Sequence, residues 1–210
     1  MTRVLAANSW TNNGDLIVDV AHLHFREGDS ILDPTYGHGI WWKRADELPA
    51  HNLTKLSNDP GSTAYSEGHD FRSMPFDDNS FDVVAYDPPY AAKGGRDTST
   101  IDDMDARFGL HDAPPTPIML QDLIDDGLTE AVRVSRRLVL VKCMTYVSSG
   151  KLWLGEFLTL QHALHLGCRL EDRFIHVGGV GPDPKDRRQI HARNNASMLY
   201  VLRVPRKKAS

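Results

Sequence analysis

Apolar positions along the chain fall into two kinds of segment, and their alternation predicts an open α/β sheet. Short apolar runs bounded by polar residues predict strands at 30–33, 52–58, 81–86, 138–144, 174–177 and 198–204. Longer stretches with apolar residues every three or four positions predict helices at 40–48, 118–134 and 152–166. Strands and helices in alternation favour a parallel sheet with helices on both faces.

A Gly-containing loop follows the first predicted strand, with the sequence Asp33-Pro-Thr-Tyr-Gly37-His-Gly39. Ligands of open α/β sheets bind beyond the carboxyl ends of the strands, so this position favours a binding site. The two glycines allow the backbone to approach a ligand closely. The N-terminus of the helix predicted to follow suits a carboxylate, and Asp33 suits an amino group. An ordinary tight turn is the alternative, and Trp42 stands where a dinucleotide motif has its third glycine.

A second motif, Asp87-Pro88-Pro89-Tyr90, directly follows the predicted strand 81–86. The two prolines fix φ and direct the chain away from the strand. The Asp87 carboxylate and the Pro88 carbonyl are then two neighbouring acceptors, which match the two hydrogens of an exocyclic NH₂ group. Tyr90 offers a flat face on which a base can stack. The alternative is a Pro-Pro turn with a capping aspartate.

The two motifs together resemble those of the class I S-adenosylmethionine-dependent methyltransferases. Within that class the sequence is similar to the amino-group methylases of nucleic acids that carry an Asp-Pro-Pro-Tyr signature. The resemblance extends from about Ser30 to Val204. It implies a Rossmann-like sheet of about seven strands with the last strand antiparallel, and S-adenosylmethionine as cofactor. We expect one domain over 1–210, with a cofactor-binding half at 30–90 and a substrate-side half at 118–210.

The resemblance also implies roles for individual residues. Catalysis would fall to Asp87, Pro88, Pro89 and Tyr90. The methionine end of the cofactor would be lined by Asp33, Thr35, Gly37 and Gly39. Asp59 would bind the ribose, with Ser57 as the alternative position, and Asp70 and Phe71 would bind the adenine.

Charge is unevenly distributed along the chain. Residues 1–90 carry 6 Lys+Arg against 14 Asp+Glu, and residues 131–210 carry 15 against 5. A basic final third suits a polyanion-binding face, although it can equally offset the acidic remainder. Within the predicted loop 178–195, the expected nucleic-acid contacts are Lys185, Arg187, Arg188 and Arg193. Residues 91–117 suit a lid or substrate loop, but their aspartates would repel phosphates, so a protein-facing loop is the alternative.

Other features narrow the class of protein. No stretch approaches the roughly 20 apolar residues of a membrane span, and the N-terminus lacks a secretory core, so we expect a cytoplasmic protein without a membrane partner. Cys143 and Cys168 are expected as buried thiols. His162 and His165 lack a third ligand at a motif-like spacing, so no metal is expected.

The favoured interpretation is therefore methylation of an exocyclic amino group in DNA, at adenine N6 first and cytosine N4 next. No inserted domain of about 100 residues is present to read a long DNA sequence, which favours a compact methylase. One alternative is an RNA guanine-N2 methyltransferase, and another is a methylase of a protein or small molecule. A non-catalytic module that binds nucleic acid is the remaining interpretation.

Overall fold

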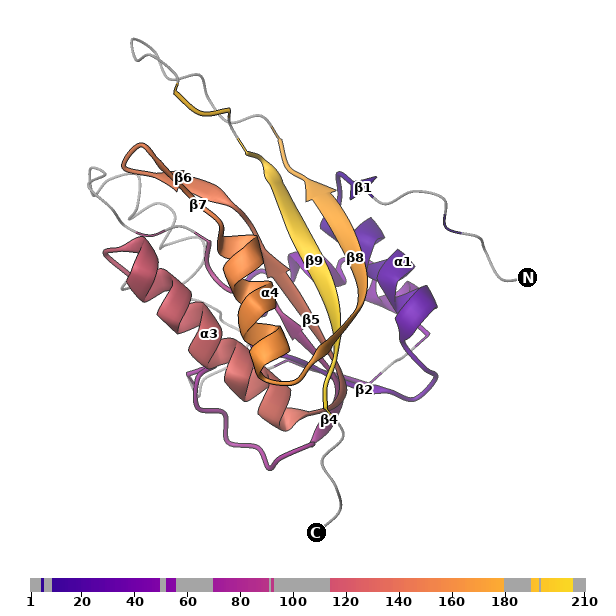
Figure 1. Ribbon diagram of the computed structural model, residues 1–210. Coiled ribbons are helices and arrows are strands. Elements are labelled where there is room, and N and C mark those ends of the chain that lie inside the picture. The colour runs from indigo at the N-terminus through magenta and orange to yellow at the C-terminus, as the bar shows by residue number, and fades with distance from the viewer. Residues whose placement is uncertain are drawn as a thin grey trace.

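The chain is described here from a computed structural model, which covers residues 5, 9–49, 52–55, 70–90, 92, 114–179, 190–192 and 194–205. These residues contain a seven-stranded sheet in the order β1-β8-β9-β5-β4-β2-β3 (Figure 1). The strands are β1 (Ser9–Trp10), β2 (Ser30–Asp33), β3 (Asn52–Lys55), β4 (Phe81–Tyr86), β5 (Ser135–Cys143), β8 (Arg169–Val177) and β9 (Ala196–Arg203). Only β9 among them runs antiparallel to its neighbours, β5 and β8. The predicted fold class, with its reversed last strand, is confirmed.

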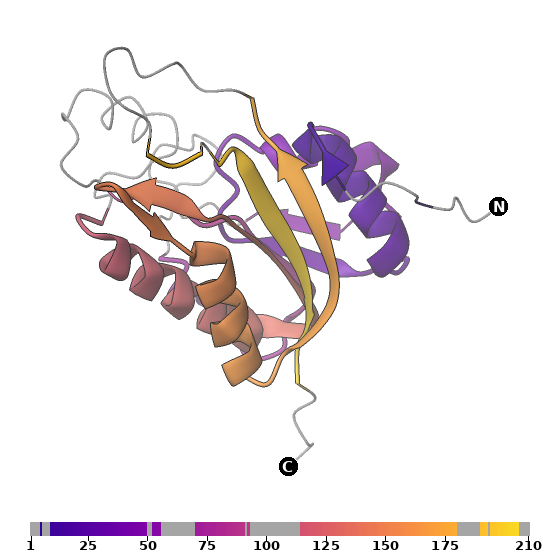
Figure 2. The same ribbon diagram turned by 45° about the horizontal axis from the view of Figure 1, so that its top comes forward.

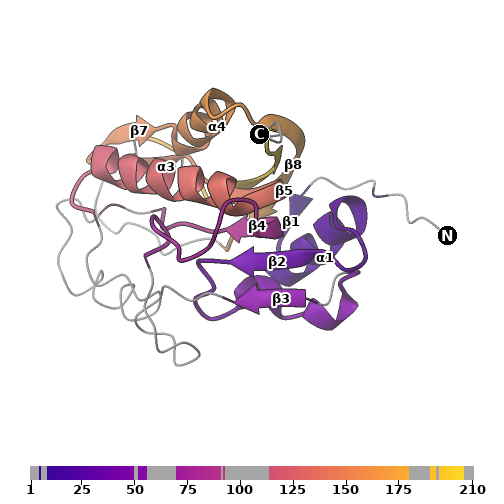
Figure 3. The ribbon, with the colours of Figure 1, turned by 90° about the horizontal axis from the view of Figure 1, so that it is seen from below.

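Helices cover both faces of this sheet. Helix α1 (Asn13–His24) lies on one face, and α3 (Pro117–Val134) and α4 (Gly155–His165) lie on the other (Figures 1 and 3). Side chains alternate along β5, so Leu138 and Leu140 pack in the cluster beneath α1. Val139 and Val141 pack in the cluster beneath α3 and α4. A strand covered on both faces has to be apolar on both, which explains the apolar run at 138–144.

Helix α1 is absent from the sequence prediction. Asn12 caps it by accepting hydrogen bonds from the backbone N–H groups of Gly14 (2.7 Å) and Asp15 (3.2 Å). The helix buries Leu16, Ile17, Val18, Val20 and Ala21 against the sheet. Its first residue lies at the carboxyl edge of the sheet, where it meets β5 through the contact described below.

The prediction of a helix at 40–48 is wrong. Two short 3₁₀ helices, η1 (Ile40–Trp42) and η2 (Ala45–Glu47), occupy this segment instead. Trp41 and Trp42 both pack into the apolar cluster beneath α1, and the two short 3₁₀ turns hold them there. Pro49 also disfavours the α-helical conformation at Leu48.

The helix predicted at 152–166 begins later, at Gly155. Before it lies a hairpin of β6 (Tyr146–Ser148) and β7 (Lys151–Trp153), visible beside α4 in Figure 2. Ser149 and Gly150 form its turn with φ of 50° and 74°, the left-handed values that tight two-residue hairpins require. A Cβ atom at position 155 would lie 2.5 Å from the Met144 carbonyl oxygen, so the helix starts on a glycine.

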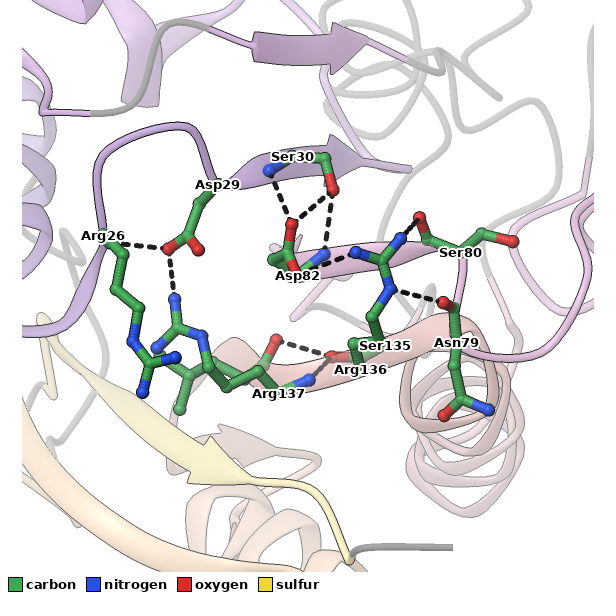
Figure 4. Close-up of polar contacts among 10 residues, drawn as sticks. Arg26, Asp29, Ser30, Asn79, Ser80, Asp82, Ser135, Arg136 and Arg137 are labelled. Atoms are coloured by element: carbon green, nitrogen blue, oxygen red, sulfur yellow. Dashed lines mark hydrogen bonds and ion pairs between the residues drawn. The ribbon is translucent and has the colours of Figure 1, made fainter. Parts of the chain in front are cut away.

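The amino ends of β2, β4 and β5 are tied together by buried and half-buried charges (Figure 4). Arg137 forms an ion pair with Asp29, and their side chains are only 12% and 7% exposed. Asp82 accepts hydrogen bonds from both the backbone and the hydroxyl of Ser30 and pairs with Arg136 at 2.9 Å. This network secures the edge of the sheet opposite to the carboxyl ends of its strands.

Candidate active site at the carboxyl edge of the sheet

The two sequence motifs lie at the ends of neighbouring strands. β2 and β4 are parallel and pair directly, with Ile31 opposite Val83 and Leu32 opposite Val84. The loop after β2 therefore lies beside Asp87, the first residue after β4. The two are joined by a hydrogen bond of 2.8 Å from the backbone N–H of Asp87 to Thr35 Oγ1.

Asp33 is buried at the base of this loop, with 3% of its surface exposed. Its carboxylate accepts hydrogen bonds from Trp42 Nε1 (2.5 Å), the backbone N–H of Thr35 (2.8 Å) and Thr35 Oγ1 (3.3 Å). Burial raises the pKa of Asp33 to about 7 against these hydrogen bonds, and the charge of Asp87 adds to the rise. Asp33 thus holds the shape of the loop, and contact with a cofactor amino group stays a prediction for it.

Both glycines of the loop adopt left-handed backbone conformations. Gly37 and Gly39 have positive φ values of 49° and 65°. A Cβ atom at position 39 would lie 2.5 Å from the hydroxyl oxygen of Tyr36. The helix expected after the loop is only the three-residue η1. The argument that a helix N-terminus would bind a carboxylate is therefore wrong for this segment.

Asp87 faces a mixed environment. Its side chain is 27% exposed, and Oδ2 lies 4.0 Å from Lys142 Nζ. Burial raises the pKa of Asp87, against the opposing effects of the Lys142 ammonium and the Trp41 indole N–H. Oδ1 is buried and has no hydrogen-bond partner among the described residues.

Lys142 is the residue of this site that the sequence analysis missed. It lies near the carboxyl end of β5, is 5% exposed, and donates a hydrogen bond of 2.7 Å to Asn13 Oδ1 on α1. Its Nζ lies 5.9 Å from the ring centroid of Trp41 and 6.0 Å from that of Tyr90. A lone lysine inside the apolar run 138–144 was the available signal, since buried lysines are rare unless paired.

Several polar atoms at this edge are buried without a partner. Within the described part of the chain, five buried side-chain atoms lack a hydrogen bond. Four of them belong to the site: Asp87 Oδ1, Tyr90 OH, Trp41 Nε1 and Thr145 Oγ1, which follows β5. Buried polar groups are normally paired, so such a concentration indicates the place of a ligand with both donors and acceptors.

Asp70 and Phe71 lie in a different setting from the one expected for adenine binding. The Asp70 carboxylate accepts hydrogen bonds from the Arg72 guanidinium at 2.6 to 3.0 Å. The ring of Phe71 packs on that of Tyr86, with the ring centroids 5.6 Å apart, and lies close to Gly127 of α3. Their described contacts are thus with Arg72 and the α3 side of the sheet, and the adenine role stays a prediction.

The remaining predicted residues, Asp59, Lys185, Arg187, Arg188 and Arg193, lie outside the described residues, as do most of 91–117 and 178–195. The described arginines of the final third largely pair with carboxylates of the chain itself. Those that do are Arg133, Arg136, Arg137, Arg169 and Arg203. Much of the basic charge in the described part therefore offsets nearby acids.

The described residues contain neither a membrane-spanning helix nor a cluster of metal-binding side chains. No helix there is both long and apolar enough to cross a membrane. No three His, Cys, Asp or Glu side chains there gather into a group that could hold a metal ion. Cys143 and Cys168 are free and buried, as expected.

Comparison with known proteins shows the fold. No protein-family model and no curated protein sequence matches the chain. A complex of the Haloferax volcanii Trm112 methyltransferase activator with a provisionally assigned methyltransferase gives a TM-score of 0.56, with 13% identity over 94% of this chain and 90% of that chain. A provisionally assigned methyltransferase of Bacillus halodurans gives 0.53, with 14% identity over 91% and 98%. Magnesium protoporphyrin IX methyltransferase of Synechocystis, with bound SAH, gives 0.53, with 7% identity over 92% and 81%. The chain has the α/β fold of these methyltransferases.

Proposed function

We propose that this protein transfers the methyl group of S-adenosylmethionine to an exocyclic amino group of a nucleic-acid base. Adenine N6 in DNA is the favoured acceptor, and cytosine N4 is next. The observation that carries the proposal is Asp87 Oδ1, a buried acceptor without a partner among the described residues, placed directly after β4. An amino group of a base would supply the missing donor.

The residues present fit the cofactor. The left-handed Gly37 and Gly39 let the loop after β2 turn tightly, so its backbone can approach a ligand. The buried indole N–H of Trp41 lies beside the Asp87 carboxylate and lowers its pKa, so it helps to position Asp87 next to the cofactor loop. When bound, the cofactor supplies a methyl group that its sulfonium has already activated. The similarity in fold to methyltransferases supports this choice of cofactor.

The chemistry then depends on holding the acceptor nitrogen. An amino group on an aromatic ring is a weak nucleophile because its lone pair is delocalised into the ring. Hydrogen bonds from its two protons to Asp87 and the Pro88 carbonyl favour a pyramidal nitrogen, and they strengthen as positive charge develops. Since burial raises the pKa of Asp87, this carboxylate accepts the released proton more readily than an exposed one. Tyr90 holds the ring by stacking, and a base in a duplex has to be flipped out first.

A transfer assay tests the proposal. The protein is incubated with S-adenosylmethionine labelled in the methyl group and with DNA, RNA and protein in separate reactions, and each labelled polymer is digested to its monomers. We expect label in N6-methyladenine from DNA. Transfer to protein alone, or to no polymer, would refute the proposal, and label in N2-methylguanine from RNA would replace the acceptor.

Two variants make the assay specific to the site. Asp87→Ala should abolish transfer while cofactor binding, measured by calorimetry, stays within about threefold, because Asp87 acts on the acceptor. Asp122→Ala removes an exposed carboxylate on α3 and should leave both quantities unchanged. Full activity of Asp87→Ala would contradict the catalytic assignment.

A further inference from the structure

Lys142 adds a donor beside the acceptor that the sequence motif supplies. β4 and β5 pair in parallel, with Tyr86 opposite Val141, so Asp87 and Lys142 are the next residues along each strand. Their charged atoms, Asp87 Oδ2 and Lys142 Nζ, lie 4.0 Å apart, which is too long for a hydrogen bond between them. A carboxylate and an ammonium therefore stand side by side at the same edge of the sheet.

The position of the Lys142 ammonium is fixed by its neighbours. Asn13 Oδ1 accepts one hydrogen bond at 2.7 Å, and an ammonium has three donors. The rings of Trp41 and Tyr90 flank it at about cation–π distance, 5.9 and 6.0 Å. In the described structure, Asn13 is the one hydrogen-bond partner of Nζ, so donors remain for a ligand held between Tyr90 and Asp87.

We infer that Lys142 is a specificity-determining residue that donates a hydrogen bond to the ring nitrogen next to the methylated amino group. The inference rests on the proposed function. In adenine, N6 lies beside the acceptor N1, and in cytosine, N4 lies beside the acceptor N3. Asp87 and Lys142 together thus present an acceptor and a donor, the complement of this amino and ring-nitrogen edge. A ring that carries C–H at the second position would leave the buried ammonium without its partner.

The charge of Lys142 is compatible with a cationic methyl donor. Asp87 carries the opposite charge 4.0 Å away, so the pair is close to neutral when seen from the rest of the site. His176, on β8, contributes no charge at neutral pH, because burial and the nearby Lys142 lower its pKa to about 4. Lys142 therefore acts on the base through directed hydrogen bonds from its N–H groups more than through its net charge.

A base analogue tests the inference. Rates of transfer are measured on two oligonucleotides that differ only in adenine against 1-deazaadenine at the target, or cytosine against 3-deazacytosine if the digest shows N4-methylcytosine. The wild-type protein should prefer the natural base by about 10- to 100-fold, as expected for a hydrogen bond from a charged donor. Lys142→Met should reduce this preference to about threefold or less. Any intrinsic difference in reactivity between the two bases is common to both proteins, so it cancels when the preference of the wild-type protein is divided by that of Lys142→Met.

Controls separate the outcomes. Lys151→Met, at an exposed position of β7, should keep the wild-type preference. Asn13→Ala, which removes the partner that holds Lys142, should weaken the preference without removing the ammonium, and it serves if Lys142→Met fails to fold. If Lys142→Met slows both substrates equally and keeps the wild-type ratio, Lys142 serves only to adjust Asp87, and the inference is overturned. No transfer by the wild-type protein to any base would overturn the proposed function as well.

Discussion

Thr35 and Asp87 join the two motifs of the site through one short hydrogen bond. The backbone N–H of Asp87 donates to Thr35 Oγ1 at 2.8 Å, and the same hydroxyl donates to Asp33 Oδ1 at 3.3 Å. A single threonine therefore links the loop after β2 to the residue that follows β4. The position of the Asp87 carboxylate depends on a residue 52 positions earlier in the chain.

Replacing this threonine tests the link. Thr35→Val keeps the shape but leaves the Asp87 N–H without an acceptor, which should lower the free energy of unfolding by about 1–3 kcal/mol. A small displacement of Asp87 should also reduce kcat by about 10- to 100-fold. Denaturant unfolding and the transfer assay measure the two effects. Thr35→Ser keeps the hydroxyl and should restore most of both, and equal losses in the two variants would argue against the link.

Asp33 should make stability fall as pH rises. Its pKa in the folded protein is about 7, against an ordinary value of 3.8. Between these values the folded state binds more protons than the unfolded state, so ionisation favours unfolding, by up to about 4 kcal/mol above pH 7. We expect the difference in unfolding free energy between Asp33→Asn and the wild-type protein to shift in favour of the variant from pH 4 to pH 8. A difference that does not change with pH would contradict the raised pKa.

Tyr90 should act through its ring. Tyr90→Phe keeps the stacking face and removes only the hydroxyl, which has no partner among the described residues and is left for the ligand, so kcat/KM should fall by about tenfold or less. Tyr90→Ala loses the stacking of a base, about 1–3 kcal/mol, and also the ring beside Lys142. Its kcat/KM for the oligonucleotide should fall by about 5- to 150-fold with cofactor binding retained. The reverse order of the two variants would assign the effect to the hydroxyl.

Local patterns predicted the central part of the fold well. The strand at 81–86 has the predicted bounds, and α3 begins one residue before the predicted 118. These elements are long or fully covered, so their apolar patterns are strong. The failures arose where packing overrides the pattern. Residues 40–48 look helical in sequence but form two 3₁₀ helices that bury both tryptophans, and β7 includes the first two residues of the helix predicted at 152–166.

The site was predicted only as far as it is local in sequence. Asp87 and Tyr90 belong to one short motif, and the loop from Asp33 to Gly39 belongs to another, so each could be recognised. The contact between Lys142 and Asn13 spans 129 positions and depends on α1, which the sequence analysis did not predict. The pairing of β5 with β4 brings this ammonium beside Asp87, and α1 supplies the Asn13 that holds it.

The opposite edge of the sheet should control stability without affecting the reaction. Arg137→Met leaves the Asp29 carboxylate buried without its guanidinium, which should cost about 3–5 kcal/mol in unfolding free energy. Arg136→Met breaks the ion pair with Asp82 at 2.9 Å, where the side chains are 48% and 25% exposed, and should cost about 1 kcal/mol or less. Denaturant unfolding compares the two variants. This edge lies at the amino ends of the strands, so kcat per folded molecule should equal the wild-type value in both variants. A loss of kcat in Arg137→Met, measured at a denaturant concentration below its unfolding transition, would show that the two edges of the sheet are coupled.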